Sequence, residues 1–480
     1  MRILLSFIVA LAAIACAPVE TPSENHPDQT NPNDTTLVEP SDTLQTPEDV
    51  PAEEEKPVET PEEEMKDPWA EEPVEDGVNV NQYNDFERVA LQSEIQNVQP
   101  MTGIVLWTDS SKSESIKDCI QLEFAYMLYN QVCKEKDVYD WTPMDNLLDD
   151  VASRGHQLVV RFRYTYVGKS CAVPDYIKAW EGYQETKGMS EGKVTYFPDW
   201  RCEELQRFHL DFHKRFAERY DNDPRLAFVQ TGFGLWAEYH IYDGPRVIGK
   251  TFPSKDFQAT FFKEMEKYFK NTTWSISIDA ADASYSPLKA QRDLLDIRFG
   301  NFDDSFMHED HGDYNHECWV FFGNQRYKTA PAGGEFSYYT DYDQRHCLDK
   351  EGMYGRVFEE EVAKYHMTYI NGNDQPGYQS KERIKEASMA MGYNYEILDY
   401  RVKGDQAAVL IKNIGVAPIY RDAYVSINGN RGDYSLMNLM PGMRAWVLIQ
   451  GSGVSADVVP EIVCDHLVPG QKIEYKANVE

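Results

Sequence analysis

Residues 226–240 read Leu-Ala-Phe-Val-Gln-Thr-Gly-Phe-Gly-Leu-Trp-Ala-Glu-Tyr-His. The first five form a short apolar run typical of a buried strand, and the glycines that follow interrupt it. Glu238 is therefore expected where a strand gives way to a loop. A second carboxylate, Glu335, closes the run Pro331-Ala332-Gly333-Gly334-Glu335 in the same manner, downstream of the apolar, strand-like segment Trp319–Phe322. Both glutamates are thus predicted at strand ends.

Segments of two kinds alternate between residues 100 and 390. Short apolar runs predict strands at Gly103–Trp107, Leu122–Met127, Gln157–Phe162, Leu226–Gln230, Trp274–Ile278, Ile297–Phe299, the run ending in Glu335, and Met367–Ile370. Amphipathic stretches predict helices at Thr142–Val151, Glu203–Tyr220, Asp256–Phe269, Pro287–Leu295 and Tyr354–Tyr365. This alternation predicts an α/β fold, a closed (β/α)8 TIM barrel over residues 81–392. In such a barrel the chemistry lies at the carboxyl ends of the strands, and Glu238 would follow the fourth strand and Glu335 the seventh.

The spacing of apolar residues changes after residue 392, from alternating strand and helix patterns to a series of short strand patterns. Short alternating runs at Tyr395–Val402, Ala407–Lys412, Ala423–Ile427 and Arg444–Ile449 are separated by turns such as Asn428-Gly429-Asn430. Residues 393–480 are therefore predicted to form a small C-terminal antiparallel β-sandwich. Such an appendage can bind glycan, but more often it packs against the barrel and does no chemistry.

The first sixteen residues indicate an export signal. Met1-Arg2 supplies a positive start, residues 3–14 are apolar, and Ala13-Ile14-Ala15 places small residues before Cys16. This pattern predicts residues 1–16 to be a bacterial lipoprotein signal, with lipidated Cys16 as the membrane anchor. We expect a bacterial outer-membrane lipoprotein, facing either the cell surface or the periplasm. An ordinary secretory signal, in which Cys16 is incidental, is the alternative.

Residues 17–80 are predicted to be a disordered tether. Residues 17–76 contain 20 Asp or Glu, two Lys and 11 Pro, and Trp69 is the only aromatic residue among them. Such a segment cannot bury enough apolar surface to offset its chain entropy. It holds more than half of the formal net charge of −33. No basic cluster suggests nucleic acid, and the remaining acidic charge argues against acidic polymers unless a local arginine patch intervenes.

The seven cysteines after Cys16 do not define a framework. They are scattered without a Cys-x-x-Cys pair or a zinc spacing, and an exported location permits disulfides such as Cys171 with Cys202 or Cys318 with Cys347. No cofactor is predicted. The segment 308–316 is rich in His, Asp and Glu, but its spacing matches no metal motif, so a polar loop at the rim of the site is favoured over a metal centre.

Two carboxylates at strand ends suit hydrolysis of a sugar linkage. One can protonate the departing oxygen, and the other can meet the developing oxocarbenium ion. A lone glutamate at a strand end is more often a solvated or ion-paired surface group. The aromatic residues and glycines around both glutamates favour a site that is lined for sugar.

Other strand ends carry candidate substrate-binding residues. Arg161 and Arg163 end the third strand and could keep a carboxylate ionised or bind substrate, unless they form structural ion pairs. Aromatic rings that could stack on sugar are Trp107, Trp236 and Tyr338, and polar groups that could contact hydroxyls are His240, Asp279, His308 and Asn371.

The chain resembles a known group of enzymes. A fourth-strand Glu, a seventh-strand Glu and a C-terminal β-sandwich together resemble the clan A glycoside hydrolases. The segments 223–232 and 235–240, with Gly333-Gly334-Glu335, are similar to an uncharacterised bacterial domain-of-unknown-function family with a glycoside-hydrolase-like barrel. The resemblance implies that Glu238 is the acid/base and Glu335 the nucleophile of a retaining mechanism. Clan A enzymes usually have Asn before the acid, but Ala237 stands there; the uncharacterised family usually has Gly.

These features predict a cell-envelope lipoprotein that hydrolyses glycosidic bonds in polysaccharide or oligosaccharide. A non-catalytic glycan-binding lipoprotein on the same barrel is the main alternative. A structural protein of the envelope is a weaker reading, because it leaves the glutamate pair unexplained. The predicted partners are carbohydrate and, through the lipid, the membrane.

Overall fold

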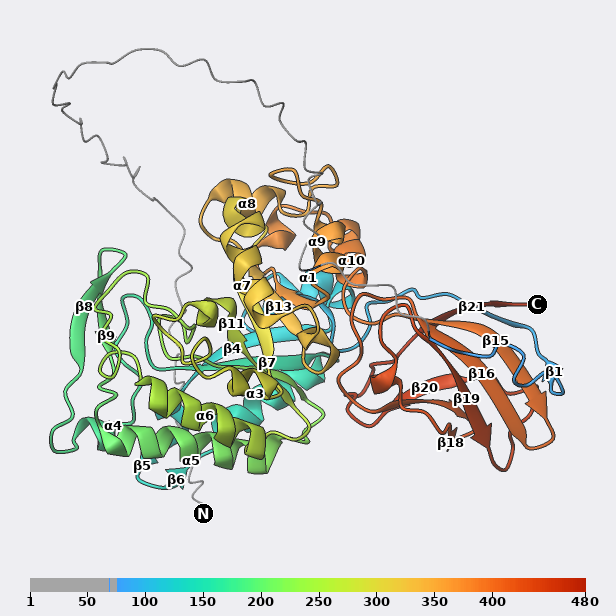
Figure 1. Ribbon diagram of the computed structural model, residues 1–480, viewed down its shortest axis with the longest axis horizontal. Helices are drawn as coiled ribbons and strands as arrows, with labels where there is room; N and C mark the ends of the chain where they lie inside the picture. The colour runs from blue at the N-terminus through green and yellow to red at the C-terminus, as the bar shows by residue number, and fades with distance from the viewer. Residues whose placement is uncertain (1–68, 70–75) are drawn as a thin grey trace, which may run out of the picture. The chain divides into compact units, whose positions relative to one another are not determined.

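The computed structural model describes Trp69 and residues 76–480 (Figure 1). The predicted signal with Cys16 and most of the predicted tether lie outside the described residues. The chain divides into two compact units, residues 1–64 and 65–480, and everything described here belongs to the second. None of the helices in the described part is long and apolar enough to cross a membrane.

The centre of the molecule is a closed barrel of eight parallel strands. Each strand pairs with its neighbour in chain order, and β14 closes the ring by pairing with β3. The predicted TIM barrel is confirmed, with β10 as its fourth strand and β13 as its seventh. The strands are β3 (Gly103–Trp107), β4 (Leu122–Leu128), β7 (Gln157–Arg163), β10 (Leu226–Gln230), β11 (Thr273–Ser277), β12 (Gly300–Phe306), β13 (Ala332–Phe336) and β14 (Met367–Asn371).

Helices surround this barrel because the strands are apolar on both faces. Ile104 and Leu106 of β3 pack outward in the larger hydrophobic core, whereas Val105 between them points into the barrel core. The long helices α5 and α6 lie side by side along one flank (Figure 1). The helices are α1 (Ser113–Ile116), α2 (Tyr129–Val132), α3 (Thr142–Ser153), α4 (Asp175–Lys178), α5 (Glu203–Tyr220), α6 (Lys255–Tyr268), α7 (Tyr314–Phe322), α8 (Asp341–His346), α9 (Phe358–Lys364) and α10 (Lys381–Met389).

Two small hairpins interrupt the barrel pattern. The strands β5 (Cys133–Glu135) and β6 (Val138–Tyr139) precede α3, and β8 (Thr186–Ser190) and β9 (Lys193–Phe197) lie between β7 and α5. The second hairpin extends beyond the barrel at the left of Figure 1. Sequence patterning did not predict either hairpin.

The C-terminal residues form two sheets over a shared core. One sheet has the order β19-β16-β15-β21-β2 with β1 on its edge, and the other has the order β18-β17-β20. The pairing is antiparallel apart from β15 with β21. β1 and β2 belong to residues 81–392, which the sequence assigns to the barrel, but they pair with this sheet. The strands are β1 (Glu87–Arg88), β2 (Leu91–Ser93), β15 (Tyr395–Lys403), β16 (Gln406–Asn413), β17 (Ala423–Ile427), β18 (Asn430–Arg431), β19 (Arg444–Gln450), β20 (Glu461–Cys464) and β21 (Tyr475–Val479).

The β-sandwich packs on the amino ends of the barrel strands. Arg421 donates to the carbonyl of Leu226 at the start of β10 and to Thr272 just before β11. Gln157, the first residue of β7, donates to the carbonyl of His466. The sandwich therefore covers the end of the barrel opposite Glu238 and Glu335, and it leaves the carboxyl ends to the barrel's own loops.

Four sequence predictions were wrong. The sixth strand is Gly300–Phe306 rather than Ile297–Phe299, and the apolar segment Trp319–Phe322 ends helix α7. The segment Pro287–Leu295 forms no α-helix, and only a 3-10 turn at Arg292–Asp296 occupies part of it. The suggested disulfides are also absent, since all seven cysteines from Cys119 to Cys464 are free thiols.

Trp69 differs from its predicted place in a disordered tether. Its side chain is only 6% exposed and belongs to the barrel's outer core. The indole Nε1 donates to the carbonyl of Lys364 at 2.6 Å, and the ring packs against Tyr365 and Trp319 with centroid distances of 5.3 and 6.3 Å. Trp69 is therefore held against the barrel between α7 and α9.

Replacing Trp69 with Ala is expected to lower the free energy of unfolding by about 3 kcal/mol, because a buried indole and its hydrogen bond are both lost. Chemical denaturation of the two proteins measures the difference. Trp180→Ala is the control, since Trp180 is 42% exposed and its removal should cost much less. Equal and small losses for the two variants would show that the packing of Trp69 does not stabilise the barrel.

Candidate active site

A tight loop after β10 holds Glu238 in place. The backbone N–H groups of Phe233 and Gly234 both donate to the carbonyl of Glu238, at 3.2 and 2.8 Å. The loop returns so closely that a Cβ on Gly234 would lie 1.8 Å from the carbonyl oxygen of His240. The glycines that mark the end of the strand in the sequence are therefore required by this close backbone approach.

The two residues before Glu238 have a left-handed backbone conformation. Trp236 has φ 51° and Ala237 has φ 58°, a backbone conformation that costs most residues with a Cβ about 1 kcal/mol each. Glycine would adopt this conformation without strain at position 237, where the sequence analysis found Ala in place of the Asn of clan A enzymes. Strained backbone of this kind persists where surrounding contacts fix it, and here it directs Glu238 into the barrel.

Arg161 is the buried cation of the site. Its Nη1 donates to Oε1 of Glu238 at 2.7 Å, and both side chains are 5% exposed or less. Its Nε and Nη2 donate to the Gln230 side-chain oxygen at 2.9 and 2.7 Å, and Gln230 in turn donates to the Tyr369 hydroxyl. The guanidinium also lies 4.2 Å from the ring centroid of Phe302. A connected network across the barrel interior thus fixes the position of Arg161.

Glu335 lies on β13 in reach of the same charges but without its own ion partner. Within residues 76–480, its carboxylate makes no hydrogen bond or ion pair. Burial raises the pKa of Glu335 to about 8. Arg161 lowers this pKa, and the negative charges of Glu238 and Asp374 offset part of that lowering. Burial also raises the pKa of Glu238, but there both Arg161 and His240 counteract it. The two carboxyl groups therefore interact, and Glu335 is the one that favours its protonated form.

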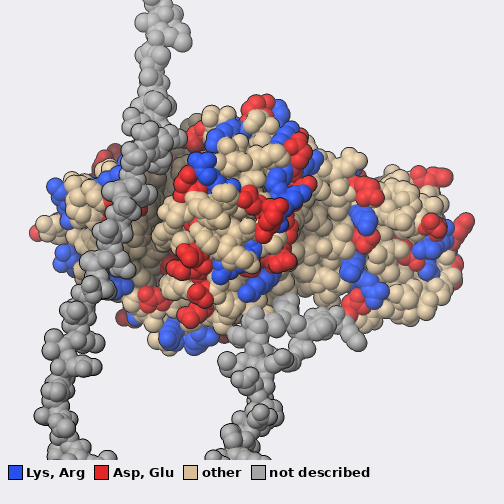
Figure 2. Space-filling model, turned by 90° about the horizontal axis from the view of Figure 1, so that it is seen from above, with Lys and Arg blue, Asp and Glu red and all other residues tan. Residues whose placement is uncertain are grey.

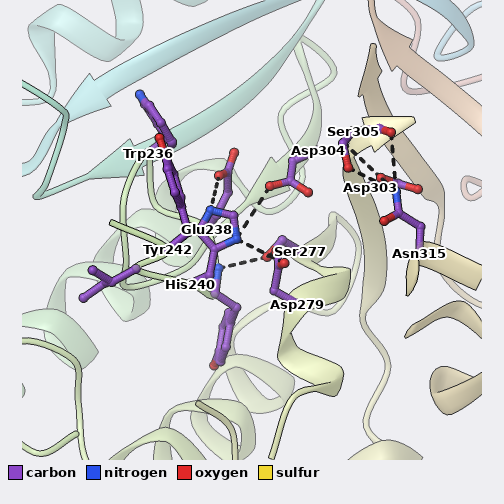
Figure 3. Close-up of polar contacts among 12 residues, drawn as sticks. Trp236, Glu238, His240, Tyr242, Ser277, Asp279, Asp303, Asp304, Ser305 and Asn315 are labelled. Atoms are coloured by element: carbon purple, nitrogen blue, oxygen red, sulfur yellow. Dashed lines mark hydrogen bonds and ion pairs between the residues drawn. The ribbon is translucent and has the colours of Figure 1, made fainter. Parts of the chain in front are cut away.

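His240 lies at the centre of a group of carboxylates (Figure 3). Its Nδ1 is 3.1 Å from Asp279 and 3.8 Å from Asp304, and its Nε2 is 3.4 Å from Glu238. Burial alone would lower the pKa of His240, but the three carboxylates raise it well above its ordinary value. Ser277 donates to Asp279 at 2.7 Å. The raised pKa favours the imidazolium form of His240, which contacts all three acidic side chains.

Asp304 is a site residue that sequence analysis missed. Burial, with the charges of Asp279 and Glu238, raises the pKa of Asp304 well above its ordinary value. Its neighbour Asp303 points away from the cluster toward Asn315, as the alternation of a strand requires (Figure 3). The sequence signal that could have identified Asp304 is the pair of aspartates between Phe302 and Phe306. It was missed because the sixth strand was predicted at Ile297–Phe299, three residues too early.

Glu238, His240 and Asp304 also offer ligand atoms within 4.8 Å of one another, the spacing of a cation site. The donor set of one imidazole and two carboxylates suits a divalent metal. In this structure, His240 and Arg161 already contact these carboxylates, and Nη1 of Arg161 lies 2.7 Å from Oε1 of Glu238.

Four predicted binding residues have buried polar atoms without a hydrogen-bond partner in the described part of the chain. These are Trp107 Nε1, Arg163 Nε, His240 Nε2 and Asn371 Oδ1. Trp107, Arg163 and Asn371 lie at the carboxyl ends of β3, β7 and β14, and Asn371 is the register partner of Glu335. Unsatisfied buried polar atoms are costly, so their grouping beside the two glutamates is typical of a site that binds a polar ligand.

The remaining predicted residues lie around the opening of the barrel. Trp236 stacks on Tyr242 with a centroid distance of 5.7 Å, and His308 stacks on Tyr339 at 4.6 Å. Tyr338 is 46% exposed. Tyr242 also contacts Glu191, at the turn of the β8–β9 hairpin. Seen from above, the surface is hollowed between the lobe that carries this hairpin and the central mass that carries α7 and α8 (Figure 2).

No family model and no curated protein matches the chain. Among solved structures, it resembles the catalytic domain of a β-amylase from Paenibacillus polymyxa, with 10% identity, 61% of this chain and 99% of that chain covered, and a TM-score of 0.36. It also resembles endo-glycoceramidase II from Rhodococcus sp., with 8% identity, 76% and 100% coverage, and a TM-score of 0.38. An α-galactosidase from Thermus thermophilus matches at 11% identity, 66% coverage of each chain and a TM-score of 0.36. These neighbours are glycoside hydrolases, while the barrel assignment itself rests on the strand pairing.

Proposed function

We propose that this protein is a glycoside hydrolase that acts on polysaccharide or oligosaccharide. The observation that carries the proposal is the pairing of Glu238 and Glu335 across Arg161 at the carboxyl ends of the fourth and seventh barrel strands. One carboxyl group is ion-paired and the other has its pKa raised to about 8. A glycosidase needs one ionised and one protonated carboxyl group in the same site.

The electrostatics of the site favour a definite division of roles. Glu335 carries the proton and would donate it to the departing glycosidic oxygen. Glu238, ionised beside Arg161, would form the bond to the anomeric carbon, and a water activated by Glu335 would then release the sugar with retained configuration. This proposal exchanges the roles that the resemblance to clan A enzymes implies for the two residues.

The polar and aromatic groups around the carboxylates suit a sugar. Asn371 and Trp107 supply an acceptor and a donor for hydroxyl groups, and the exposed ring of Tyr338 suits stacking on a sugar face. The alternative of a non-catalytic glycan binder uses the same groups, with Glu238 and Glu335 contacting hydroxyl groups rather than cleaving a bond.

A screen against plant, algal and host glycans, measured by product release and by binding, tests the proposal. Release of sugar from at least one glycan is the expected result. Binding without release from any of them would instead establish the glycan-binding alternative.

We also propose that the chain is a bacterial outer-membrane lipoprotein anchored through Cys16. The support is the positive start Met1-Arg2, the apolar residues 3–14 and the small residues Ala13-Ile14-Ala15 before Cys16. Cys16→Ser is expected to move the protein from the membrane fraction to the soluble fraction at moderate salt, with unchanged thermal stability. Membrane fractionation of the variant is the measurement, and retention in the membrane would place the anchor elsewhere.

A further inference from the structure

Arg163 is a half-buried cation without a counter-charge. Its guanidinium lies 4.4 Å from the ring centroid of Tyr166 and 5.8 Å from that of Tyr126. It forms no ion pair within the described part of the chain, and its Nε is buried without a hydrogen-bond partner. Arg161, two residues earlier, has its charge balanced by Glu238. The two arginines therefore differ in function: one holds a carboxylate, and the other is available.

Arg163 is part of the lining of the candidate active site. It ends β7 and lies on the same face of that strand as Arg161, because side chains two residues apart share a face. Tyr126 accepts a hydrogen bond from Arg161 at 3.4 Å, and Tyr166 packs edge-on against Trp236. Tyr126 therefore links Arg163 to Arg161, the ion partner of Glu238. Tyr166 links Arg163 to Trp236, in the loop that leads to Glu238.

The charge of the site makes an unpaired arginine informative. Glu238, Glu335, Asp279 and Asp304 converge in the barrel opening, and a negative group would be repelled from their immediate surroundings. An arginine at one edge creates a single place where a negative group is favoured. Its planar fork matches the two oxygens of a carboxylate or a sulfate, and partial burial strengthens the contact.

We propose that Arg163 binds an anionic group of the glycan, a carboxylate or a sulfate ester, so that the substrate is an acidic polysaccharide. This inference rests on the proposed function for the identity of the ligand as a glycan. The negative net charge of the protein does not oppose it, because the contact is local and the site presents its own cation.

The test compares matched pairs of oligosaccharides by calorimetry on the full chain. Oligomers of polygalacturonate, alginate and glucuronoxylan are each paired with a carboxyl-reduced form, and sulfated galactan and fucan oligomers with a desulfated form. The wild type is expected to bind at least one charged oligomer about tenfold or more tighter than its neutral partner. The carboxylate and sulfate pairs show which of the two groups is recognised.

Arg163→Met should abolish this preference, because it weakens binding of the charged oligomer far more than binding of its neutral partner, and Arg163→Lys should restore only part of the preference. Arg292→Met is the matched control, because Arg292 also lies over an aromatic ring, Phe321, but in a turn that precedes β12. The absence of any charge preference, or a preference that Arg163→Met leaves intact, would overturn the inference.

The outcome is separable from that of the proposed function. Binding of a charged oligomer that depends on Arg163 but gives no product would refute hydrolysis and retain the inference. Cleavage of a glycan by a wild type that binds charged oligomers no tighter than their neutral partners would retain hydrolysis and refute the inference.

Discussion

Glu335→Gln is expected to reduce kcat on a natural glycan by about a thousandfold, because the amide cannot donate a proton to the departing oxygen. Binding should stay within a few-fold, since glutamine keeps the shape of the side chain. An activated aryl glycoside, whose leaving group needs no proton, should still be turned over by this variant. Initial rates on the two kinds of substrate measure the effect, and Glu238→Gln, expected to be inactive on both, is the matched comparison.

The pH dependence follows from the raised pKa of Glu335, about 8. The wild-type rate on a natural glycan should fall as pH rises through this value, because the proton to be donated is lost. The aryl glycoside should lack this alkaline limb. If Glu238→Gln instead spares the aryl substrate and Glu335→Gln does not, the roles are those implied by the clan A resemblance, and the ion pair of Glu238 with Arg161 must break on substrate binding.

The barrel was predictable because seven of its eight strands are apolar runs bounded by turn residues or helices. The sixth strand was misplaced because Gly300–Phe306 contains two aspartates, and a rule that rewards apolar runs prefers the neighbouring Ile297–Phe299. The opposite error placed Trp319–Phe322 in a strand, since a short apolar run does not by itself distinguish a strand from a buried helix end. The first error hid a site residue, since the misplaced strand carries Asp304.

The site was predictable only in part for a related reason. Glu238 was visible because it follows a strand and two glycines, and Glu335 because it follows two glycines near the end of its strand. The arginines were visible at the end of β7. The partners that fix their charges were not. Gln230 and Asp304 come from other strands, and their proximity depends on barrel closure rather than on local sequence. The burial of Trp69 was not predictable for the same reason. Its acidic sequence neighbours predict disorder, and the residues that it packs against lie about 300 positions later in the chain.

Arg161→Met is expected to lower the free energy of unfolding by about 3–5 kcal/mol at neutral pH, because it removes the closer cationic partner of the buried Glu238 carboxylate and leaves only His240, 3.4 Å away. The loss should depend on pH. Without Arg161, the pKa of Glu238 rises further above its unfolded value, so stability is retained at low pH and declines as pH rises through that pKa. Chemical denaturation at pH 5 and pH 8 measures this difference.

The double variant Arg161→Met/Glu238→Gln should recover a large part of the loss at pH 8, since it no longer buries a charge. The recovery isolates the coupling between the two side chains from the packing that Arg161 shares with Phe302. Arg431→Met is the control, because Arg431 pairs with Asp465 where both side chains are more than 40% exposed and should cost under about 1 kcal/mol. If Arg161→Met costs no more than this control, the carboxylate of Glu238 is already neutral in the wild type. That result would also remove the reason for assigning it the role of the ionised partner.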